Sequence, residues 1–272
     1  MRVCGVGDNV VDRYFTQKLM FPGGNAVNFA VHARRSGAHA AYLGVIGTDG
    51  DGDLIRSSLQ AEGVELERLR VETGPSAFAT VHMDDDGNNR KWGLCEKGVS
   101  VFRLDSADLE YLAGFDLVHT GETSRLDDQL AQVRDRVAIS FDFSERDLDY
   151  AAGVLPYLKA AAFSRGHASD DEVARVLAAA QSAGVELVTI TQGARGATVS
   201  HKGQTLFAPS VPVDAVDTLG AGDAFVSRLV YRVLSGVSLG QAASDAAQYA
   251  ALICGTRGAF GHARPITREI PA

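Results

Sequence analysis

Short apolar segments typical of buried strands alternate with amphipathic helical patterns along most of the 272-residue chain. Strands that are joined through helices pair in parallel, and the helices then cover both faces of the sheet. We therefore expect an α/β fold of three layers around a mostly parallel sheet, with residues 1–272 in a single domain. The expected strands are 2–6, 40–46, 117–119, 137–141, 187–190 and a hairpin over 198–207, and the expected helices are 24–36, 54–62, 126–134, 170–183, 221–234 and 239–254.

One segment, residues 75–101, departs from this alternation. It has strand-forming residues over 78–83, a polar turn over 84–89, and then charged and aromatic residues from Arg90. This pattern predicts an antiparallel hairpin that is too small to fold alone. Two interpretations stay open. The hairpin, together with residues of about 10–22, forms a small β lid that closes over a substrate, or it is an edge hairpin of the main sheet.

Composition and charge exclude several functional classes. The formal net charge is −8, and no block of lysine or arginine offsets it, which argues against a nucleic-acid partner or an anionic membrane surface. The three cysteines, Cys4, Cys95 and Cys254, are isolated in the sequence and are expected to be reduced thiols. No apolar run approaches membrane-spanning length. These features predict a cytoplasmic protein.

The run D-T-L-G-A-G-D at residues 217–223 carries the strongest chemical signal. It lies between an apolar stretch and the helical pattern that begins at 221. Glycines at the start of a helix let a ligand approach free backbone N–H groups, and the helix dipole favours an anion there. A carboxylate at that point, Asp223, is unfavourable beside an anion unless it accepts a proton from an attacking hydroxyl. The combination indicates phosphoryl transfer. The alternative is an ordinary first-turn acid next to a glycine-containing loop.

A second group of polar residues follows the first strand and precedes the first helix. The carboxylates of Asp8 and Asp12 and the amides of Asn25 and Asn28 are suited to binding sugar hydroxyls, and Gly24 allows close approach. In open α/β sheets, ligands bind outside the carboxyl ends of the strands, where these residues are expected. Ordinary turn chemistry is the alternative for each of them.

Two further glycine-containing segments give weaker signals. Residues 191–196, T-Q-G-A-R-G, follow a strand that is expected to be buried and could form a flat surface for nucleotide phosphates or a plain β-turn. Residues 255–259 close the last helix, and a glycine at the helix end explains them without a function.

In this order and spacing, the segments GGNAVN at 23–28, GVIGTDGDG at 44–52, TQGARG at 191–196 and DTLGAGDAF at 217–225 resemble the ribokinase-like (PfkB-type) sugar kinases over nearly the whole chain. The resemblance implies a ribokinase-like fold and ATP-dependent phosphorylation of a sugar hydroxyl. Mg²⁺ would be carried on ATP, and K⁺ would be bound by Asp217 and the carbonyl of Leu219.

The resemblance also implies roles for individual residues. Asp223 would be the base, with the backbone amides of Gly220, Ala221 and Gly222 as the anion hole. The sugar would be bound by Asp12, Gly24, Asn28 and Glu122, to which Asp8 and Asn25 are added as neighbours and Arg90 as a cation on the expected lid. The nucleotide would be bound by Thr191, Gly193 and Gly196 with Gly220 and Gly222.

Within this family the chain looks most similar to the fructoselysine 6-kinases, which phosphorylate the 6-hydroxyl of a fructosamine. Fructokinase, ribokinase and nucleoside kinase activities are the alternatives in the same family. An N-x-x-E motif that organises metal in many members is not found at 164–170. Either Asp170, Asp171 or Glu172 substitutes, or ATP and water hold the metal.

Two alternatives come from other functional classes. Residues 5–10 resemble part of a dinucleotide fingerprint, but without its third glycine, and a non-catalytic sugar- or nucleotide-binding regulator is also conceivable on this fold. Because a small sheet cannot bury both of its faces, we further expect a homodimer that pairs through the lids.

Overall fold

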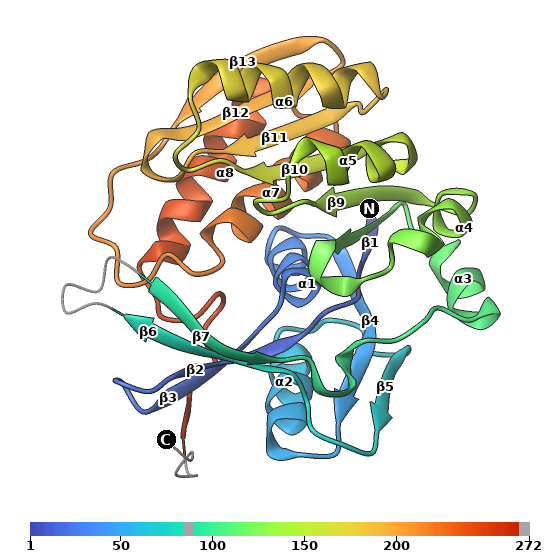
Figure 1. Cartoon of the computed structure of the whole chain (residues 1–272), viewed down its shortest axis with the longest axis vertical. Coiled ribbons are helices and arrows are strands. Elements are labelled where there is room, and N and C mark those ends of the chain that lie inside the picture. Colours follow the sequence, from blue (N-terminus) through green and yellow to red (C-terminus); the bar gives the residue numbers. More distant parts are fainter. Residues whose placement is uncertain (84–89, 267–272) are drawn as a thin grey trace.

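A nine-stranded sheet forms the centre of the protein (Figure 1). This computed structural model describes residues 1–83 and 90–266. The strands of the large sheet are β1 (Arg2–Val6), β4 (His39–Gly47), β5 (Leu69–Glu72), β8 (Leu117–Gly121), β9 (Ala138–Asp142), β10 (Ala160–Ser164), β11 (Leu187–Thr191), β12 (Gly196–His201) and β13 (Gln204–Pro209). Their order is β13-β12-β11-β10-β9-β8-β1-β4-β5. Strand β12 pairs antiparallel with both β11 and β13, and all other neighbouring strands of this sheet pair in parallel, which confirms the expected mostly parallel sheet.

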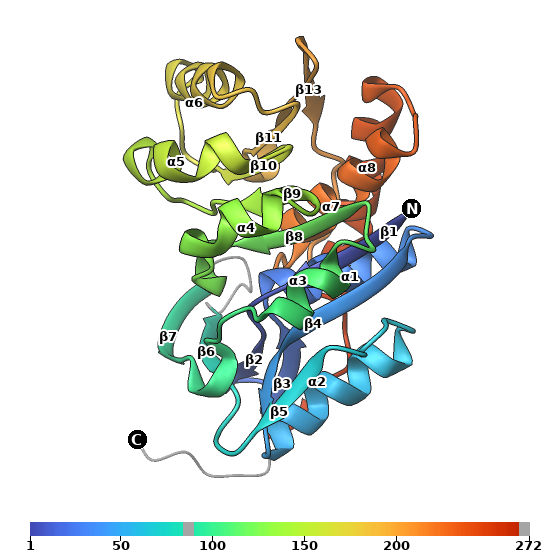
Figure 2. The same ribbon diagram turned by 90° about the vertical axis from the view of Figure 1, so that its right-hand side faces the viewer.

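Helices cover both faces of this sheet and make the fold a three-layer sandwich (Figure 2). One face packs against α1 (Asn25–Arg35), α2 (Gly50–Ala61), α7 (Ala221–Leu234) and α8 (Leu239–Cys254). The other face packs against α3 (Ser106–Leu112), α4 (Leu130–Arg134), α5 (Leu148–Val154) and α6 (Asp170–Ser182). Single turns of 3₁₀ helix occur at Gly98–Ser100, Glu122–Ser124, Asp127–Gln129, Leu155–Tyr157 and Gly193–Arg195.

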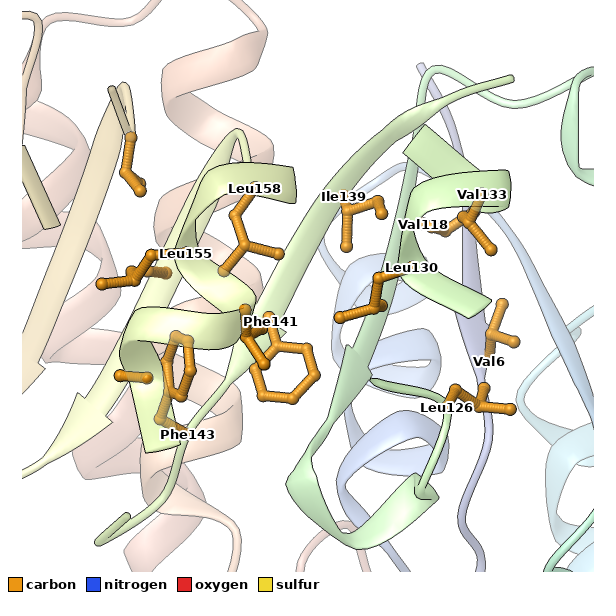
Figure 3. Close-up of a cluster of buried hydrophobic side chains, with 14 of the residues drawn as sticks. Val6, Val118, Leu126, Leu130, Val133, Ile139, Phe141, Phe143, Leu155 and Leu158 are labelled. Carbon is orange, nitrogen blue, oxygen red and sulfur yellow. The ribbon is translucent and has the colours of Figure 1, made fainter. Parts of the chain in front are cut away.

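Two aromatic residues at the end of β9 hold the carboxyl end of this strand in place. Phe141 and Phe143 pack into the core between the sheet and the helices α4 and α5 (Figure 3), and Phe143 stacks on Phe163 with ring centroids 4.5 Å apart. Because side chains alternate along a strand, the residues that alternate with them, Ser140 and Asp142, point to the opposite face, where α1 and α7 lie. Truncating a buried Phe to Ala costs about 3–5 kcal/mol, so this arrangement is firmly held.

A second sheet of five strands lies beside the large one (Figure 1). Its strands are β2 (Val10–Tyr14), β3 (Leu19–Gly23), β6 (Phe78–Met83), β7 (Arg90–Glu96) and β14 (Arg264–Pro265), in the order β14-β3-β2-β6-β7. The predicted hairpin within 75–101 is present as the antiparallel pair β6 and β7. Its first strand pairs with β2, so the alternative that placed this hairpin at the edge of the main sheet is wrong.

Polar contacts attach the small sheet to the body of the protein. The Arg13 guanidinium, on β2, pairs with Asp51 at the start of α2 and stacks over the ring of Phe78, 3.8 Å from its centroid. Tyr14, also on β2, donates a hydrogen bond to Asp217 in the loop before α7. The small sheet is therefore joined both to α2 and to the loop that carries the expected anion site.

The elements differ from expectation where local signals were weak. Helix α2 begins four residues earlier than expected, because the Asp49 side chain caps the N–H of Gly52 and offsets the low helix propensity of the glycines. The expected helix over 126–134 is a 3₁₀ turn followed by α4. Strand β10 was not expected, since Ala160–Ser164 is rich in alanine, which has low strand propensity; its central position in the sheet decides its conformation.

Candidate active site

Polar residues, most of them expected from the sequence, gather at the carboxyl ends of the parallel strands. Asp8 follows β1, Glu122 follows β8, and Asp142 ends β9. The first turns of α1 and α7 add Asn25, Asn28 and Asp223, and hydrogen bonds join several of these side chains. This is the edge of an open α/β sheet at which ligands bind.

The start of α7 has the geometry of an anion site. Gly220 precedes the helix with φ 74°, a left-handed conformation, and a Cβ on it would overlap the side chain of Ala259. Gly222, in the first turn, is exposed, and a Cβ there would meet no heavy atom within 4 Å. The first N–H groups of a helix lack carbonyl partners within it, so backbone amides at this position can face an anion. The Ala221 N–H makes a 3.3 Å hydrogen bond to the Thr218 carbonyl, which an anion would have to replace.

Two asparagine amides hold the carboxylate of Asp223. Asn25 Nδ2 donates to Oδ1 over 2.9 Å, and Asn28 Nδ2 donates to Oδ2 over 2.6 Å. Burial, and next the charge of Asp142, raise the pKa of Asp223 to about 7, although the two amide hydrogen bonds act in the opposite direction. A carboxyl with a pKa near neutrality at the start of an anion-binding helix can exchange a proton with a bound hydroxyl.

Asp142 is a site residue to which the sequence analysis gave no role. Its Oδ2 accepts a 2.9 Å hydrogen bond from Asn25 Nδ2, and its Oδ1 accepts from the backbone N–H of Ser144 over 2.7 Å. Burial is the main cause that raises the pKa of Asp142 to about 6. Its position was detectable, because an acid directly after the apolar end of a strand is placed at the ligand edge of the sheet.

His119 is the other residue that the sequence analysis did not single out. It is buried in β8, stacks on Phe29 of α1 with centroids 4.0 Å apart, and lies within hydrogen-bond distance of Asn25 and Ser140. Burial lowers the pKa of His119 to about 3, so the ring is neutral at physiological pH. A histidine within a strand of apolar residues gives no sequence signal of its partners, which come from distant segments.

Asp8 and Asp12 lie at the base of the site, close to the two glycines before α1. Asp8 accepts hydrogen bonds from the N–H groups of Asn25 and Ala26 and so caps α1 from a distant segment, a structural role different from the local turn named above as the alternative. Whether it also contacts a sugar stays a prediction. Asp12 is buried, and a Cβ on Gly23 would lie only 2.6 Å from its Oδ2.

Gly24 and Asn28 occupy positions that fit the expected sugar site. Gly24 has φ 107°, and a Cβ there would lie 2.7 Å from the Cα of Asn9, so the position requires glycine. Asn28 is buried, and its Oδ1 has no hydrogen-bond partner among the described residues. A buried amide oxygen in this state is costly, and a ligand hydroxyl would satisfy it.

Glu122 and Arg90 were also expected beside the sugar, and the structure describes the side chain of Glu122 but not that of Arg90. Glu122 lies in the 3₁₀ turn after β8 and pairs with Arg146, whose Nε is 3.1 Å from Oε2. Arg90 begins β7, and its side chain lies outside the described part of the structure. Its role as a cation near the substrate stays a prediction.

The expected nucleotide residues lie at the end of β11 and the start of β12. Thr191 ends β11 and its hydroxyl donates to the Phe163 carbonyl, while Gly193 is exposed with φ 59°. A Cβ on Gly196 would overlap the Ala208 carbonyl of β13, which explains this glycine by strand packing alone. Nucleotide binding by these residues remains a prediction.

Protein donors surround the carboxylate of Asp217, the expected cation ligand. Its Oδ1 accepts from the Leu219 N–H over 3.0 Å, and its Oδ2 accepts from Tyr14 Oη over 2.6 Å and from the Gly258 N–H over 3.0 Å. These donors offset the buried charge, and a monovalent cation at Asp217 and Leu219 stays an expectation from the resemblance.

The acids considered as replacements for the N-x-x-E motif lie at the start of α6. Glu172 Oε1 is 3.7 Å from Nε of the buried Arg165, while Asp170 and Asp171 are exposed. Across residues 1–83 and 90–266, no group of three or more His, Cys, Asp or Glu side chains is arranged to hold a metal ion.

The chain matches the pfkB family of carbohydrate kinases over residues 8–264. It belongs to this family. It is 36% identical to the fructosamine kinase FrlD of Bacillus subtilis, over 99% of this chain and 96% of that protein. It is 30% identical to the fructoselysine 6-kinase of Escherichia coli, over 94% of this chain and 98% of that protein.

Solved structures support the same fold. The ribokinase of Arabidopsis thaliana, complexed with ribose and ATP, superposes with a TM-score of 0.80 at 19% identity and covers 95% of this chain and 94% of its own. The fructokinase of Xylella fastidiosa with bound ATP has a TM-score of 0.80 at 18% identity, with 95% and 94% coverage. The ribokinase-like fold predicted from the sequence is confirmed.

The family membership establishes the chain as an ATP-dependent sugar kinase, and kinases of this family use ATP with Mg²⁺. The hypotheses of a dinucleotide-dependent oxidoreductase and of a non-catalytic regulator are therefore wrong. Among the helices of the described residues, none has both the length and the apolar character needed to cross a bilayer.

Proposed function

We propose that this kinase transfers the γ-phosphate of ATP to the 6-hydroxyl of fructoselysine or a related fructosamine. The observation that carries the reaction is the hydrogen-bonded carboxylate of Asp223 at the start of α7, beside the exposed backbone of Gly222. The observation that supports the substrate is the similarity, over nearly the full chain, to a fructosamine kinase and a fructoselysine 6-kinase.

In this proposal Asp223 accepts the proton of the sugar hydroxyl as that oxygen attacks the γ-phosphorus. The backbone amides of Gly220, Ala221 and Gly222 donate to the oxygens of the transferring phosphoryl group. Removing one donor of such an anion hole costs about 10²–10³ in rate in other enzymes, so these amides carry a large share of the catalysis. Mg²⁺ bound to the ATP phosphates supplies further charge neutralisation.

The sugar is held on the other side of Asp223. Asn28 offers its free amide oxygen, and Asp12 and Glu122 offer carboxylates to the ring hydroxyls. A fructosamine carries a protonated amine near neutral pH, and a site with the neighbouring carboxylates of Asp142 and Asp223 favours a cation over a neutral sugar. This charge supports a fructosamine over fructose or ribose.

The small sheet is the lid in this proposal, and Thr191, Gly193 and Gly196 lie at the nucleotide. Closure of the small sheet over the carboxyl ends of the strands would exclude water from the transferring phosphoryl group. The link from Tyr14 to Asp217 joins this sheet to the loop before the anion site, so the position of the lid and the geometry of α7 are coupled.

The experiment that tests the substrate is ADP release measured with fructoselysine, other fructosamines, fructose, ribose and nucleosides. The proposal predicts the highest kcat/KM for a fructosamine. A clear preference for fructose, ribose or a nucleoside would reject the fructosamine assignment in favour of fructokinase, ribokinase or nucleoside kinase activity. No ADP release with any of these acceptors would reject the fructosamine assignment and these three alternatives together.

A further inference from the structure

The side-chain amide of Asn25 bridges two carboxylates of the site. Its Nδ2 lies 2.9 Å from Asp142 Oδ2 and 2.9 Å from Asp223 Oδ1. An amide NH₂ group has two hydrogens, so one N–H serves each carboxylate. Because ionised carboxylates only accept hydrogen bonds, the NH₂ side of Asn25 faces them when both are charged, and the carbonyl oxygen points the other way.

That carbonyl oxygen faces His119. Asn25 Oδ1 is 3.0 Å from Nε2 of the imidazole, so Nε2 carries the hydrogen and donates it. In a neutral ring the second nitrogen is then an acceptor, and Nδ1 lies 2.9 Å from the hydroxyl of Ser140, which donates to it. Phe29 stacks on the ring and fixes its plane. Each polar atom through which Ser140, His119 and Asn25 contact one another is thus assigned as a donor or an acceptor.

We propose that His119 and Asp142 are positioning residues for Asp223, and that both act through the side-chain amide of Asn25. The inference rests on the proposed role of Asp223 as proton acceptor. His119 sets the orientation of the amide, so that Asn25 presents hydrogens and not its oxygen to Asp223. Asp142 takes the second hydrogen and places a negative charge beside Asp223.

The charge of Asp142 has a direct chemical consequence. The charged groups that act on Asp223 are Asp142 and Asp8, and the amides of Asn25 and Asn28 donate to it. A neighbouring negative charge disfavours the ionised carboxylate and makes it a stronger base. Asp142 therefore brings the basicity of Asp223 closer to what proton transfer at neutral pH requires.

The pH dependence of kcat/KM for ADP release tests the role of Asp142. In the wild-type enzyme the rate falls on the acid side as Asp223 becomes protonated. With Asp142→Asn, which keeps the shape but removes the charge, the acid limb is expected to move to lower pH by about one unit. An acid limb that stays in place, whatever happens to the plateau, would overturn the role of Asp142.

A pair of substitutions tests His119. His119→Phe keeps an aromatic ring next to Phe29 but removes the donor to Asn25, and we expect kcat to fall about tenfold with little change in the KM for ATP. His119→Gln keeps an N–H donor at a similar reach and is expected to restore most of the loss. Equal kcat values for the two variants would overturn the role of His119. If His119→Phe does not fold, His119→Leu, which also removes the donor to Asn25, takes its place in the comparison with His119→Gln.

Asp223→Asn separates this inference from the function on which it rests. If Asp223→Asn keeps more than half of wild-type turnover, Asp223 is not the proton acceptor and the proposed mechanism fails. If Asp223→Asn is inactive but the acid limb of Asp142→Asn does not move, only the positioning inference fails.

Discussion

The hydroxyl of Tyr14 in the small sheet donates a 2.6 Å hydrogen bond to the buried carboxylate of Asp217, which starts the loop leading to α7. The two residues are far apart in the chain, and their contact joins the small sheet to the expected anion site. The same carboxylate also accepts the N–H of Gly258, so three separate segments meet at one carboxylate.

Tyr14→Phe removes this bond while keeping the ring that packs against Phe21. Loss of a hydrogen bond to a buried charge lowers the free energy of unfolding by about 1.5–3 kcal/mol, and kcat should fall as well, because the loop before α7 loses a fixed point. Tyr111→Phe is the control. It removes a similar bond, 2.7 Å to Glu65, away from the site, and should lower stability without lowering kcat. Equal kcat losses in the two variants would contradict the coupling.

Two glycine substitutions distinguish a structural role from a ligand-binding role at the start of α7. Gly220→Ala combines a left-handed φ with overlap against Ala259, and should lower the free energy of unfolding by about 1–3 kcal/mol. Gly222→Ala is helical and meets no atom within 4 Å, so stability should be kept or raised by up to about 1 kcal/mol.

The same Gly222→Ala variant should lose kcat/KM for ATP, because its methyl group enters the space expected for the phosphates. Denaturant unfolding and ADP release measured on both variants check this pair. Full activity of a stable Gly222→Ala protein would argue against an anion site there.

The pH dependence of stability provides a separate test of the environment of Asp223. Because its pKa in the folded protein is raised to about 7 from a reference of 3.8, the charged form is disfavoured on folding. The resulting loss of folding stability is absent below about pH 4 and grows as the pH rises toward 7. Asp223→Asn should therefore raise the free energy of unfolding at pH 8 by about 2 kcal/mol and change it little at pH 4. This figure is smaller than the full pKa shift would give, because Asp223 is only half-buried and solvent screens its charge.

Melting temperatures of the ligand-free protein and of Asp223→Asn, compared at each pH, isolate this effect. The comparison is necessary because His32 and His119, whose pKa values burial lowers to about 3, act in the opposite direction. The stability that these two histidines contribute rises between about pH 3 and 6.5, and it cancels when the two proteins are compared at the same pH. A stabilisation that is independent of pH would show that Asp223 is not held in a charge-unfavourable environment.

The outer strand of the small sheet leads to a prediction about assembly. Trp92 and Leu94 on β7 are 52% and 55% exposed, which is high for large apolar side chains. We expect a homodimer in which these strands of two copies face each other and bury them. Light scattering at micromolar concentration should give twice the chain mass, and Leu94→Lys should shift it toward the monomer. A monomeric mass for the wild type would contradict the prediction.

The sequence was most informative where local chemistry determines structure. The alternation of patterns predicted the large sheet, and the helix from Ala221 was predicted with its observed bounds. Asp223, Asn25 and Asn28 were selected from their positions near glycines at helix starts, and the structure brings all three into direct contact.

The parts that escaped prediction depend on contacts between distant segments. His119 and Asp142 lie on neighbouring strands that meet α1 only after the sheet has formed, so no spacing in the chain reveals their link to Asn25. Tyr14 meets Asp217 by the same kind of long-range packing. Strand β10 is set by its neighbours on both sides and not by the propensity of its alanines.

The central claim, that Asp223 accepts the proton of the attacking hydroxyl, is tested most directly by the turnover of Asp223→Asn at saturating ATP and fructosamine. A positioned base contributes about 10²–10⁴ in rate, so kcat should fall by that factor while the fold and the affinity for ATP are kept. If Asp223 only capped the helix, asparagine would replace it with little loss. Turnover above half of the wild-type value in a folded variant would contradict the account.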